Sequence, residues 1–292
     1  GAGPGRRILM TTEDATRVLL EGIAFPESPR WHDGRLWFSD WMAHQVIALD
    51  ENGASEVIVE VDAFPISIDW LPGGPTLITA GRELLRMDPD GTLAAHADLS
   101  ELTQHGLNEI VVDGRGYAYV NGPGFDMMAG EEPKPGMVAV VTRDNEARQV
   151  AEDVAFPNGM AITADGSTLI VADSYGRELT AFDVGGDGSL SNRRVWADLG
   201  EGTPDGICLD AEEAVWYADV PNRRCVRVAE GGEVLQTIEL DRGGFACMLG
   251  GTDGRTLFIA AQVWNGPEEV GSGPRTGQIL AVEASAPHAG YP

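Results

Sequence analysis

Apolar and polar positions alternate along most of the chain, and short Gly-rich turns interrupt the alternation. Between residues 156 and 175, a short polar start leads into an apolar run, an Asp-Gly turn at Asp165 and a second run rich in β-branched residues. This arrangement is typical of a β-hairpin. Helices are not predicted, because Val, Ile, Trp and Tyr recur with a period of two between the turns.

The hairpin pattern occurs six times, at intervals of roughly 40 to 50 residues, which is the repeat length of propeller blades. One position is equivalent in all six copies: Glu27, Ile66, Asn108, Asn158, Asp205 and Cys247. We therefore predict an all-β, six-bladed β-propeller with four antiparallel strands per blade. Residues 10–292 are expected to form this single domain, and residues 1–9 are interpreted as a cloning remnant or a disordered segment.

The last copy contains only three predicted strands, the third at 277–282. Residues 16–20 precede the first blade in the same way that residues 56–61 precede the second. We expect this N-terminal segment to complete the last blade and close the ring, which removes the exposed sheet edges. A long insertion, residues 122–135, separates the second and third predicted strands of the third blade.

Four of the six equivalent positions carry oxygen ligands: Glu27, Asn108, Asn158 and Asp205. Any one of them alone is typical of a turn or a strand start. In a propeller, however, equivalent positions converge on the central channel, where four such side chains would repel one another or stay unsatisfied. The register therefore predicts one divalent cation, calcium first, with zinc, magnesium or manganese as alternatives.

Three aspartates, Asp40, Asp173 and Asp219, end the second strands of the blades that carry Glu27, Asn158 and Asp205. The end of a second strand lies beside the start of the first, so these aspartates are candidates for orienting the ligands from behind. The alternative is that they bind backbone amides of nearby loops.

Apolar residues are expected around the polar centre. The insertion in the third blade carries Phe125 and Met127 and could form a wall or lid over the site, or could pack against the neighbouring blade. Ile66, Leu107 and Cys247 lie near the predicted channel mouth and suggest a partly apolar substrate pocket.

The chain has a net charge of −26 and a sequence pI near 4.3. This charge disfavours nucleic-acid and membrane-surface partners. The three cysteines lack the spacing of a metal site or a disulfide framework, which favours a reducing, cytoplasmic location. We expect a small-molecule substrate and a monomer or small homo-oligomer.

Four motifs resemble those of the SMP-30/gluconolactonase/LRE family: Phe25-Pro26-Glu27, Leu107-Asn108-Glu109, Phe156-Pro157-Asn158-Gly159 and Pro204-Asp205-Gly206. The resemblance covers almost the whole chain after Met10. It implies a six-bladed propeller in which Glu27, Asn158 and Asp205 hold a catalytic metal, with Asn108 close enough to bind metal-linked water or substrate. Members that act on sugar-acid lactones often carry an Arg two residues before the Asn, where this chain has Gly106.

The expected activity is metal-dependent hydrolysis of a lactone or related ester. Asp205 or a metal-bound hydroxide would activate water, the metal would polarise the carbonyl, and Asn108 would contact the reacting centre. Phosphotriester hydrolysis at the same metal is one alternative. A non-catalytic propeller that binds proteins on its rim is the other.

Overall fold

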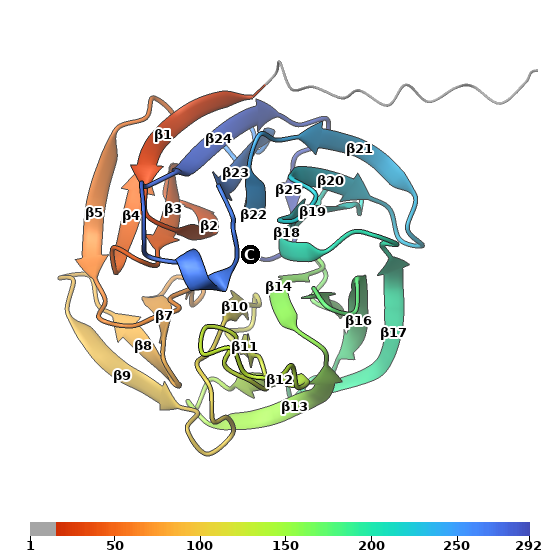
Figure 1. Cartoon of the computed structure of the whole chain (residues 1–292). Coiled ribbons are helices and arrows are strands. Elements are labelled where there is room, and N and C mark those ends of the chain that lie inside the picture. The colour runs from red at the N-terminus through yellow and green to blue at the C-terminus, as the bar shows by residue number, and fades with distance from the viewer. Residues whose placement is uncertain (1–15) are drawn as a thin grey trace, which may run out of the picture.

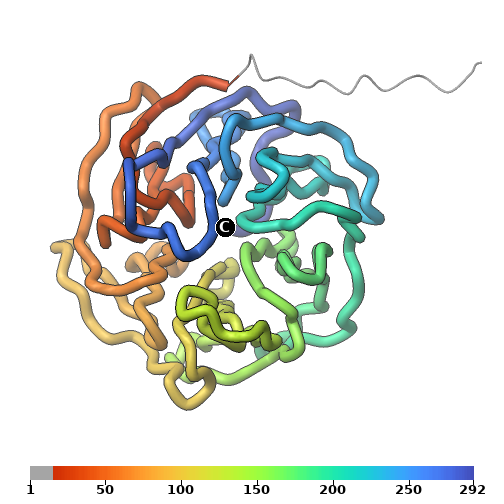
Figure 2. Tube along the Cα trace, in the orientation of Figure 1, coloured from red at the N-terminus to blue at the C-terminus, as the bar shows by residue number. Residues whose placement is uncertain are grey.

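Six small antiparallel sheets form a ring around a central axis in the computed structural model, which describes residues 16–292 (Figure 1). Each sheet is one propeller blade, so the predicted fold class is confirmed. From blade to blade the chain starts near the axis and proceeds outwards (Figure 2). The C-terminal residues of the chain return to the axis. The predicted cloning remnant, residues 1–9, lies outside the described residues.

The first three blades follow the predicted order. Blade one contains β2 (Pro26–His32), β3 (Arg35–Asp40), β4 (Gln45–Leu49) and β5 (Ser55–Glu60). Blade two contains β6 (Ile68–Trp70), β7 (Thr76–Ala80), β8 (Glu83–Met87) and β9 (Leu93–Asp98). Blade three contains β10 (Glu109–Val112), β11 (Ala118–Gly122), β12 (Gly136–Val141) and β13 (Ala147–Val154).

The other three blades complete the ring. Blade four contains β14 (Pro157–Ile162), β15 (Thr168–Asp173), β16 (Glu178–Val184) and β17 (Leu190–Asp198). Blade five contains β18 (Pro204–Asp210), β19 (Val215–Asp219), β20 (Arg224–Val228) and β21 (Val234–Glu239), joined by the short β25 (His288–Ala289). Blade six contains β22 (Gly243–Gly250), β23 (Thr256–Gln262), β24 (Gly277–Glu283) and β1 (Arg17–Ile23).

The N-terminal strand closes the ring as predicted. β1 pairs antiparallel with β24, with Arg17 opposite Ala281 and Ile23 opposite Gly277. Ile23 is buried in a core shared by blades one, five and six, so closure also buries apolar surface. The pairing of β25 with β18 was not predicted.

The hydrophobic core lies between neighbouring blades. The inner strands β10, β11 and β12 are buried along their whole length, whereas the outer strand β5 is largely exposed. This gradient follows from the stacking of blades, because the outermost strand of each sheet is an edge strand and packs against fewer neighbours.

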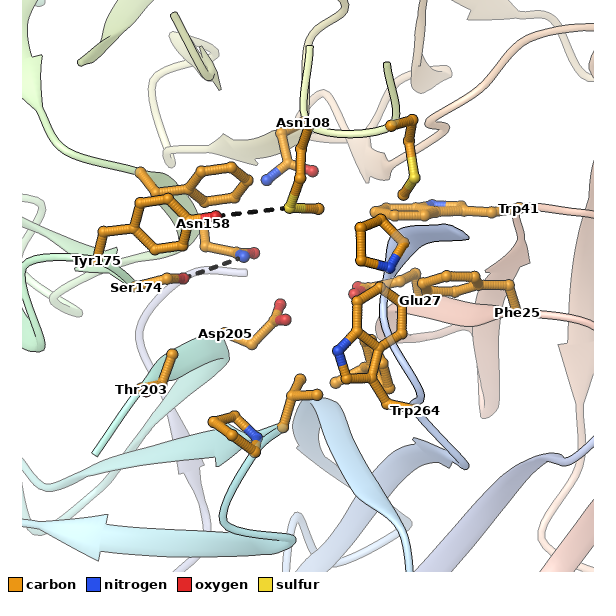
Figure 3. A pocket seen from close by; sticks show the side chains of 17 residues that line it. Phe25, Glu27, Trp41, Asn108, Asn158, Ser174, Tyr175, Thr203, Asp205 and Trp264 are labelled. Atoms are coloured by element: carbon orange, nitrogen blue, oxygen red, sulfur yellow. Dashed lines mark hydrogen bonds between the residues drawn. The ribbon is translucent and has the colours of Figure 1, made fainter. Parts of the chain in front are cut away.

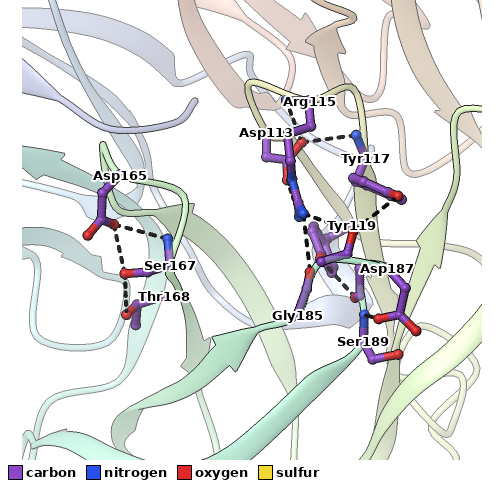
Figure 4. Close-up of polar contacts among 12 residues, drawn as sticks. Asp113, Arg115, Tyr117, Tyr119, Asp165, Ser167, Thr168, Gly185, Asp187 and Ser189 are labelled. Atoms are coloured by element: carbon purple, nitrogen blue, oxygen red, sulfur yellow. Dashed lines mark hydrogen bonds and ion pairs between the residues drawn. The ribbon is translucent and has the colours of Figure 1, made fainter.

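Aspartate side chains stabilise the turns between the first and second strands of the blades. These turns lie on the face of the ring opposite the starts of the innermost strands. Asp113 Oδ1 accepts hydrogen bonds from the backbone N–H groups of Arg115 (2.9 Å) and Tyr117 (3.0 Å) in the turn between β10 and β11. The Arg115 guanidinium binds the other Asp113 oxygen and reaches the Gly185 carbonyl of blade four (Figure 4). Side-chain acceptors of this kind are the reason that Asp-Gly marks these turns.

Short hydrogen bonds link successive blades around the channel. Ser67 Oγ donates to the Asn108 carbonyl at 2.6 Å, joining blades two and three. Asn121 Nδ2 donates to the Asn158 carbonyl at 2.7 Å, and Ser174 Oγ donates to the Pro204 carbonyl at 2.6 Å. These contacts fix the backbone at the positions whose side chains face the axis.

Candidate active site

The four predicted oxygen-bearing residues line one cavity of about 390 Å³ at the axis. Glu27 lies on β2, Asn158 on β14 and Asp205 on β18, each near the start of the innermost strand of its blade. Asn108 immediately precedes β10. In Figure 3 the side chains of Glu27, Asn158 and Asp205 are directed into the same space. Convergence of equivalent positions therefore brings together residues that are more than 40 positions apart in the sequence.

Hydrogen bonds orient the two amides. Asn108 Nδ2 donates to the Pro157 carbonyl at 3.2 Å, and Asn158 Nδ2 donates to Ser174 Oγ at 3.4 Å. Because both NH₂ groups are used as donors, the Oδ1 atoms are left as the free acceptors of these side chains. Amide oxygens are suitable ligands for a hard cation.

The two carboxyl groups are buried and close to other acids. Burial raises the pKa of Glu27 well above its usual value, and the charges of Asp205 and Glu109 raise it further. Burial and then the Glu109 charge likewise raise the pKa of Asp205. Two ionised carboxylates in this position need a compensating positive charge, and a divalent cation would supply it.

Asp205 provides a specific test of whether the donor set fits a cation. Its Oδ1 atom is buried and has no hydrogen-bond partner among residues 16–292. No group of three or more His, Cys, Asp and Glu side chains in this part of the chain could hold a metal. The predicted set differs from such a group because it consists of two carboxylates and two amides, and oxygen ligands of both kinds fit Ca²⁺.

Glu109 is a site residue that sequence reasoning did not assign. It is buried, its Oε1 has no partner among the described residues, and its charge raises the pKa values of Glu27 and Asp205. Arg30 Nη2 lies 3.6 Å from Glu109 Oε2 and donates to the Ile110 carbonyl at 2.8 Å, which ties blade one to blade three below the site. Its position next to Asn108 was the available sequence signal.

The aspartates at the ends of the second strands act on the backbone. Asp40 accepts hydrogen bonds from the N–H groups of Ala24 and Phe25, and Asp173 accepts them from Ala155 and Phe156. These amides precede the Pro-Glu27 and Pro-Asn158 pairs, so the two aspartates hold the strand starts that carry two predicted ligands. This is the backbone alternative of the sequence analysis.

Asp219 has different partners, because its carboxylate binds the Asn222 amide and the Arg224 guanidinium. Its charge still raises the pKa of Asp205. Asp219 therefore lies close to the site, but the described part of the chain shows no hydrogen bond between it and a predicted metal ligand.

The apolar candidates divide into two groups. Met127 lines the central cavity, and Phe125 lines an adjoining cavity of about 320 Å³ that also reaches Asn108. Ile66, Leu107 and Cys247 are fully buried in hydrophobic clusters and are not among the residues that line either cavity. Ile66 and Leu107 lie just before a strand start and Cys247 lies within β22, and all three side chains pack between blades.

Six aromatic residues that sequence reasoning did not assign to the site also line the cavity: Phe25, Trp41, Phe156, Tyr175, Phe245 and Trp264. Figure 3 shows Tyr175 on one side of the polar centre and Phe25, Trp41 and Trp264 on the other. Trp264 belongs to the loop between β23 and β24, which also contains the short 3₁₀ helix η2 (Pro267–Glu269).

The fold and the axial polar cluster define a six-bladed propeller with a site in its central channel. The family model of the SMP-30/Gluconolactonase/LRE-like region matches residues 25–263, and the chain belongs to this family.

Two relatives and one solved structure illustrate what this chain is similar to. The chain is 28% identical over 162 residues to 6-deoxy-6-sulfogluconolactonase of Pseudomonas putida, covering 54% of this chain and 56% of that protein. It is 27% identical over 256 residues to regucalcin of Xenopus laevis, covering 84% and 85% of the two chains. A solved calcium-binding protein, regucalcin of Agrobacterium tumefaciens, superposes with a TM-score of 0.80 at 20% identity, covering 95% and 96%. This structural likeness supports the fold alone.

No helix among residues 16–292 is long and apolar enough to cross a membrane. Cys208, Cys225 and Cys247 are buried and free.

Proposed function

We propose that this protein hydrolyses a lactone or related ester with the help of one divalent cation. The observation that carries the proposal is the cluster of Glu27, Asn108, Asn158 and Asp205 around one cavity, with a buried Asp205 Oδ1 that has no hydrogen-bond partner within residues 16–292. The name of the Pseudomonas putida relative supports lactone chemistry. We further propose calcium as the cation, because carboxylate and amide oxygens are the ligands that calcium favours.

Glu27, Asn158 and Asp205 would hold the cation, with Asn108 beside it. When bound, a divalent cation polarises a carbonyl group and stabilises the oxyanion. Asn108 contacts the reacting centre through its free Oδ1, because its NH₂ group is held by the Pro157 carbonyl. Apolar side chains form part of the cavity wall and lower the dielectric constant around these polar contacts, which strengthens them.

Asp205 is the proposed proton acceptor. Water adds through its oxygen to the lactone carbonyl carbon while Asp205 takes a water proton. The ring C–O bond then breaks, and the proton passes to the departing ring oxygen, giving the hydroxy acid. Asp205 would thus act as a base in the first step and as an acid in the second.

We also propose a cytoplasmic location and a small-molecule substrate. Free buried cysteines agree with the reducing cytoplasm expected from the sequence. A small-molecule substrate agrees with the size of the cavity, which falls in the usual range for ligand sites.

The test compares a lactone panel with an organophosphate panel, each with added calcium. We expect hydrolysis of lactones, and we expect the Asp205→Ala variant to lose at least about 100-fold in kcat because a ligand and the base are removed together. Asp144→Ala, which alters an exposed aspartate between β12 and β13, is the matched control and should keep full activity. Faster turnover of organophosphates would favour the phosphotriesterase alternative. No turnover of either panel would favour the scaffold alternative.

A further inference from the structure

A second ring of equivalent positions surrounds the mouth of the cavity. It consists of the residues two positions before each of the six equivalent positions of the repeat: Phe25, Phe64, Gly106, Phe156, Thr203 and Phe245. All six line the central cavity or the adjoining one. Phe245 lies near the start of β22, and the other five residues precede the innermost strand of their blade. The repeat therefore places these six residues, the collar, at the end of the channel where the innermost strands begin.

One side of the collar is a continuous aromatic surface from blades one, two and six. Phe25 stacks on Trp41 with ring centroids 4.9 Å apart and meets the ring of Phe245 edge-on at 5.1 Å. Phe245 in turn contacts Trp264 at 5.7 Å, and Trp41 contacts Phe64 at 5.4 Å. The Trp41 indole N–H donates to the Ile66 carbonyl, so the polar atom of this ring is satisfied by the protein rather than by a ligand.

The opposite side comes from blade four and the insertion of blade three. The rings of Phe156 and Tyr175 lie 4.9 Å apart, and Phe125 packs against both. The Tyr175 hydroxyl lies 3.6 Å from Met127 Sδ, which joins the insertion to the wall. Tyr175 is 47% exposed, so an apolar surface remains open to a ligand at the rim.

The side chains of the cavity wall disfavour other substrate classes. Among the described residues that line the central cavity there is no Lys or Arg, so an anionic sugar acid or a phosphorylated lactone would meet no positive side chain beside the proposed cation. Apart from Tyr175, the residues in this lining that carry a hydroxyl group are Ser174 and Thr203. The Ser174 hydroxyl already donates to the Pro204 carbonyl. A polyol would therefore lose hydrogen bonds to water that the wall does not replace.

We propose that the substrates of this site are neutral lactones that carry an aromatic ring or a comparable apolar group. The apolar group lies between the Phe25–Trp264 wall and the Phe156–Tyr175 wall, with the carbonyl at the polar floor. The inference rests on the proposed lactonase function, and it adds the substrate class. Aromatic faces also attract cations, so a cationic ester has to be tested as a competitor.

Turnover of three substrates tests the substrate class: dihydrocoumarin as the aromatic lactone, glucono-δ-lactone as the polyol lactone and a phenyl ester bearing a trimethylammonium group. We expect kcat/KM for dihydrocoumarin to exceed that of the other two by at least about tenfold, the discrimination available to an apolar pocket. Trp264→Ala should lower kcat/KM for dihydrocoumarin by about tenfold and for glucono-δ-lactone by less than about threefold. Tyr117→Ala, at a turn on the far face, should alter neither. Preference for the polyol or the cationic ester would overturn the proposal.

Binding to the metal-free protein separates this inference from the proposed reaction. Calorimetry would compare dihydroquinolinone, the lactam analogue of dihydrocoumarin, with the lactam analogue of glucono-δ-lactone. We expect tighter binding of the aromatic lactam, and weaker binding after Trp264→Ala. If the protein hydrolyses no lactone but binds the aromatic lactam preferentially, the proposed reaction fails and the assignment of an apolar, neutral ligand stands. Equal or reversed affinities for the two lactams would overturn the assignment.

Discussion

A single buried aspartate, Asp69, connects blade two to blade three beneath the site. Its carboxylate accepts hydrogen bonds from the N–H groups of Val112 at 2.7 Å and Trp70 at 2.9 Å. Burial raises the pKa of Asp69 from 3.8 to about 6, against the opposing effect of the Arg30 charge. The folded protein therefore binds this proton more tightly than the unfolded chain does, and Asp69 contributes stability below pH 3.8 that is lost as the pH rises through about 6.

The Asp69→Asn variant should remove this pH dependence. The difference in unfolding free energy between variant and wild type should shift in favour of the variant between about pH 4 and pH 7, by up to roughly 3 kcal/mol at 1.4 kcal/mol per pKa unit. The lost acceptor for one backbone N–H adds an offset that does not vary with pH. Denaturant unfolding of both proteins across this range is the measurement. A difference that stays constant with pH would contradict the interpretation.

At the residue scale, the positions of the predicted metal ligands could be inferred from the sequence, whereas most of the aromatic cavity wall could not. Glu27, Asn108, Asn158 and Asp205 share one repeat position, so their convergence follows from the period. The collar carries the same signal, since phenylalanine recurs two residues earlier in four blades. Trp264 and Tyr175 have no repeat equivalent that would identify them, because their position depends on how two loops pack.

At the scale of elements, two glycines allow the inner strands to approach each other. A Cβ atom at Gly159 would lie 2.7 Å from the Asp205 carbonyl oxygen and 2.8 Å from the Gly206 Cα. A Cβ atom at Gly206 would in turn lie 2.4 Å from the Ala246 Cβ. The Asn-Gly and Asp-Gly pairs at the start of β14 and β18 are therefore close-packing positions, whereas the Asp-Gly pairs of the hairpins are turns.

We expect Gly159→Ala to separate β14 from β18 and to misplace Asn158 relative to Asp205. Overpacking of this kind destabilises proteins by about 1 to 3 kcal/mol, and calcium affinity should fall with it. Gly186→Ala is the matched control, because a Cβ atom at Gly186 meets nothing within 4 Å. Thermal unfolding and calorimetric calcium binding would be measured for both variants. Unchanged calcium affinity in a folded Gly159→Ala protein would contradict this role.

Strand boundaries were largely predictable because each blade repeats the same alternation and turn chemistry. The short strand β25 and its pairing with β18 were not, since two residues carry no period. The chemistry of the loop between β23 and β24 was also missed, because it has no counterpart in the other blades from which its position could be inferred.

At the scale of the whole molecule, closure of the ring depends on one non-local sheet pair. β1 covers the edge of β24 at the junction between the first and last blades. An uncovered β24 would present unpaired N–H and C=O groups to other molecules.

Removal of residues 1–21 should therefore cause aggregation, whereas removal of residues 1–9 should leave folding unchanged. Size-exclusion chromatography with light scattering, together with circular dichroism, would distinguish the two. A monomeric and fully folded protein after removal of residues 1–21 would show that β1 is dispensable for closure.

Metal dependence of lactone hydrolysis is the most direct test of the function assigned to the channel. The measurement is acid release from dihydrocoumarin by protein that has been chelated, verified free of divalent metal, and then titrated with Ca²⁺. We predict negligible hydrolysis by the metal-free protein and recovery that saturates at one equivalent of Ca²⁺ in wild type but not in Asp205→Ala. Full hydrolysis by the metal-free protein, unchanged on addition of Ca²⁺, would contradict a catalytic metal at Glu27, Asn158 and Asp205.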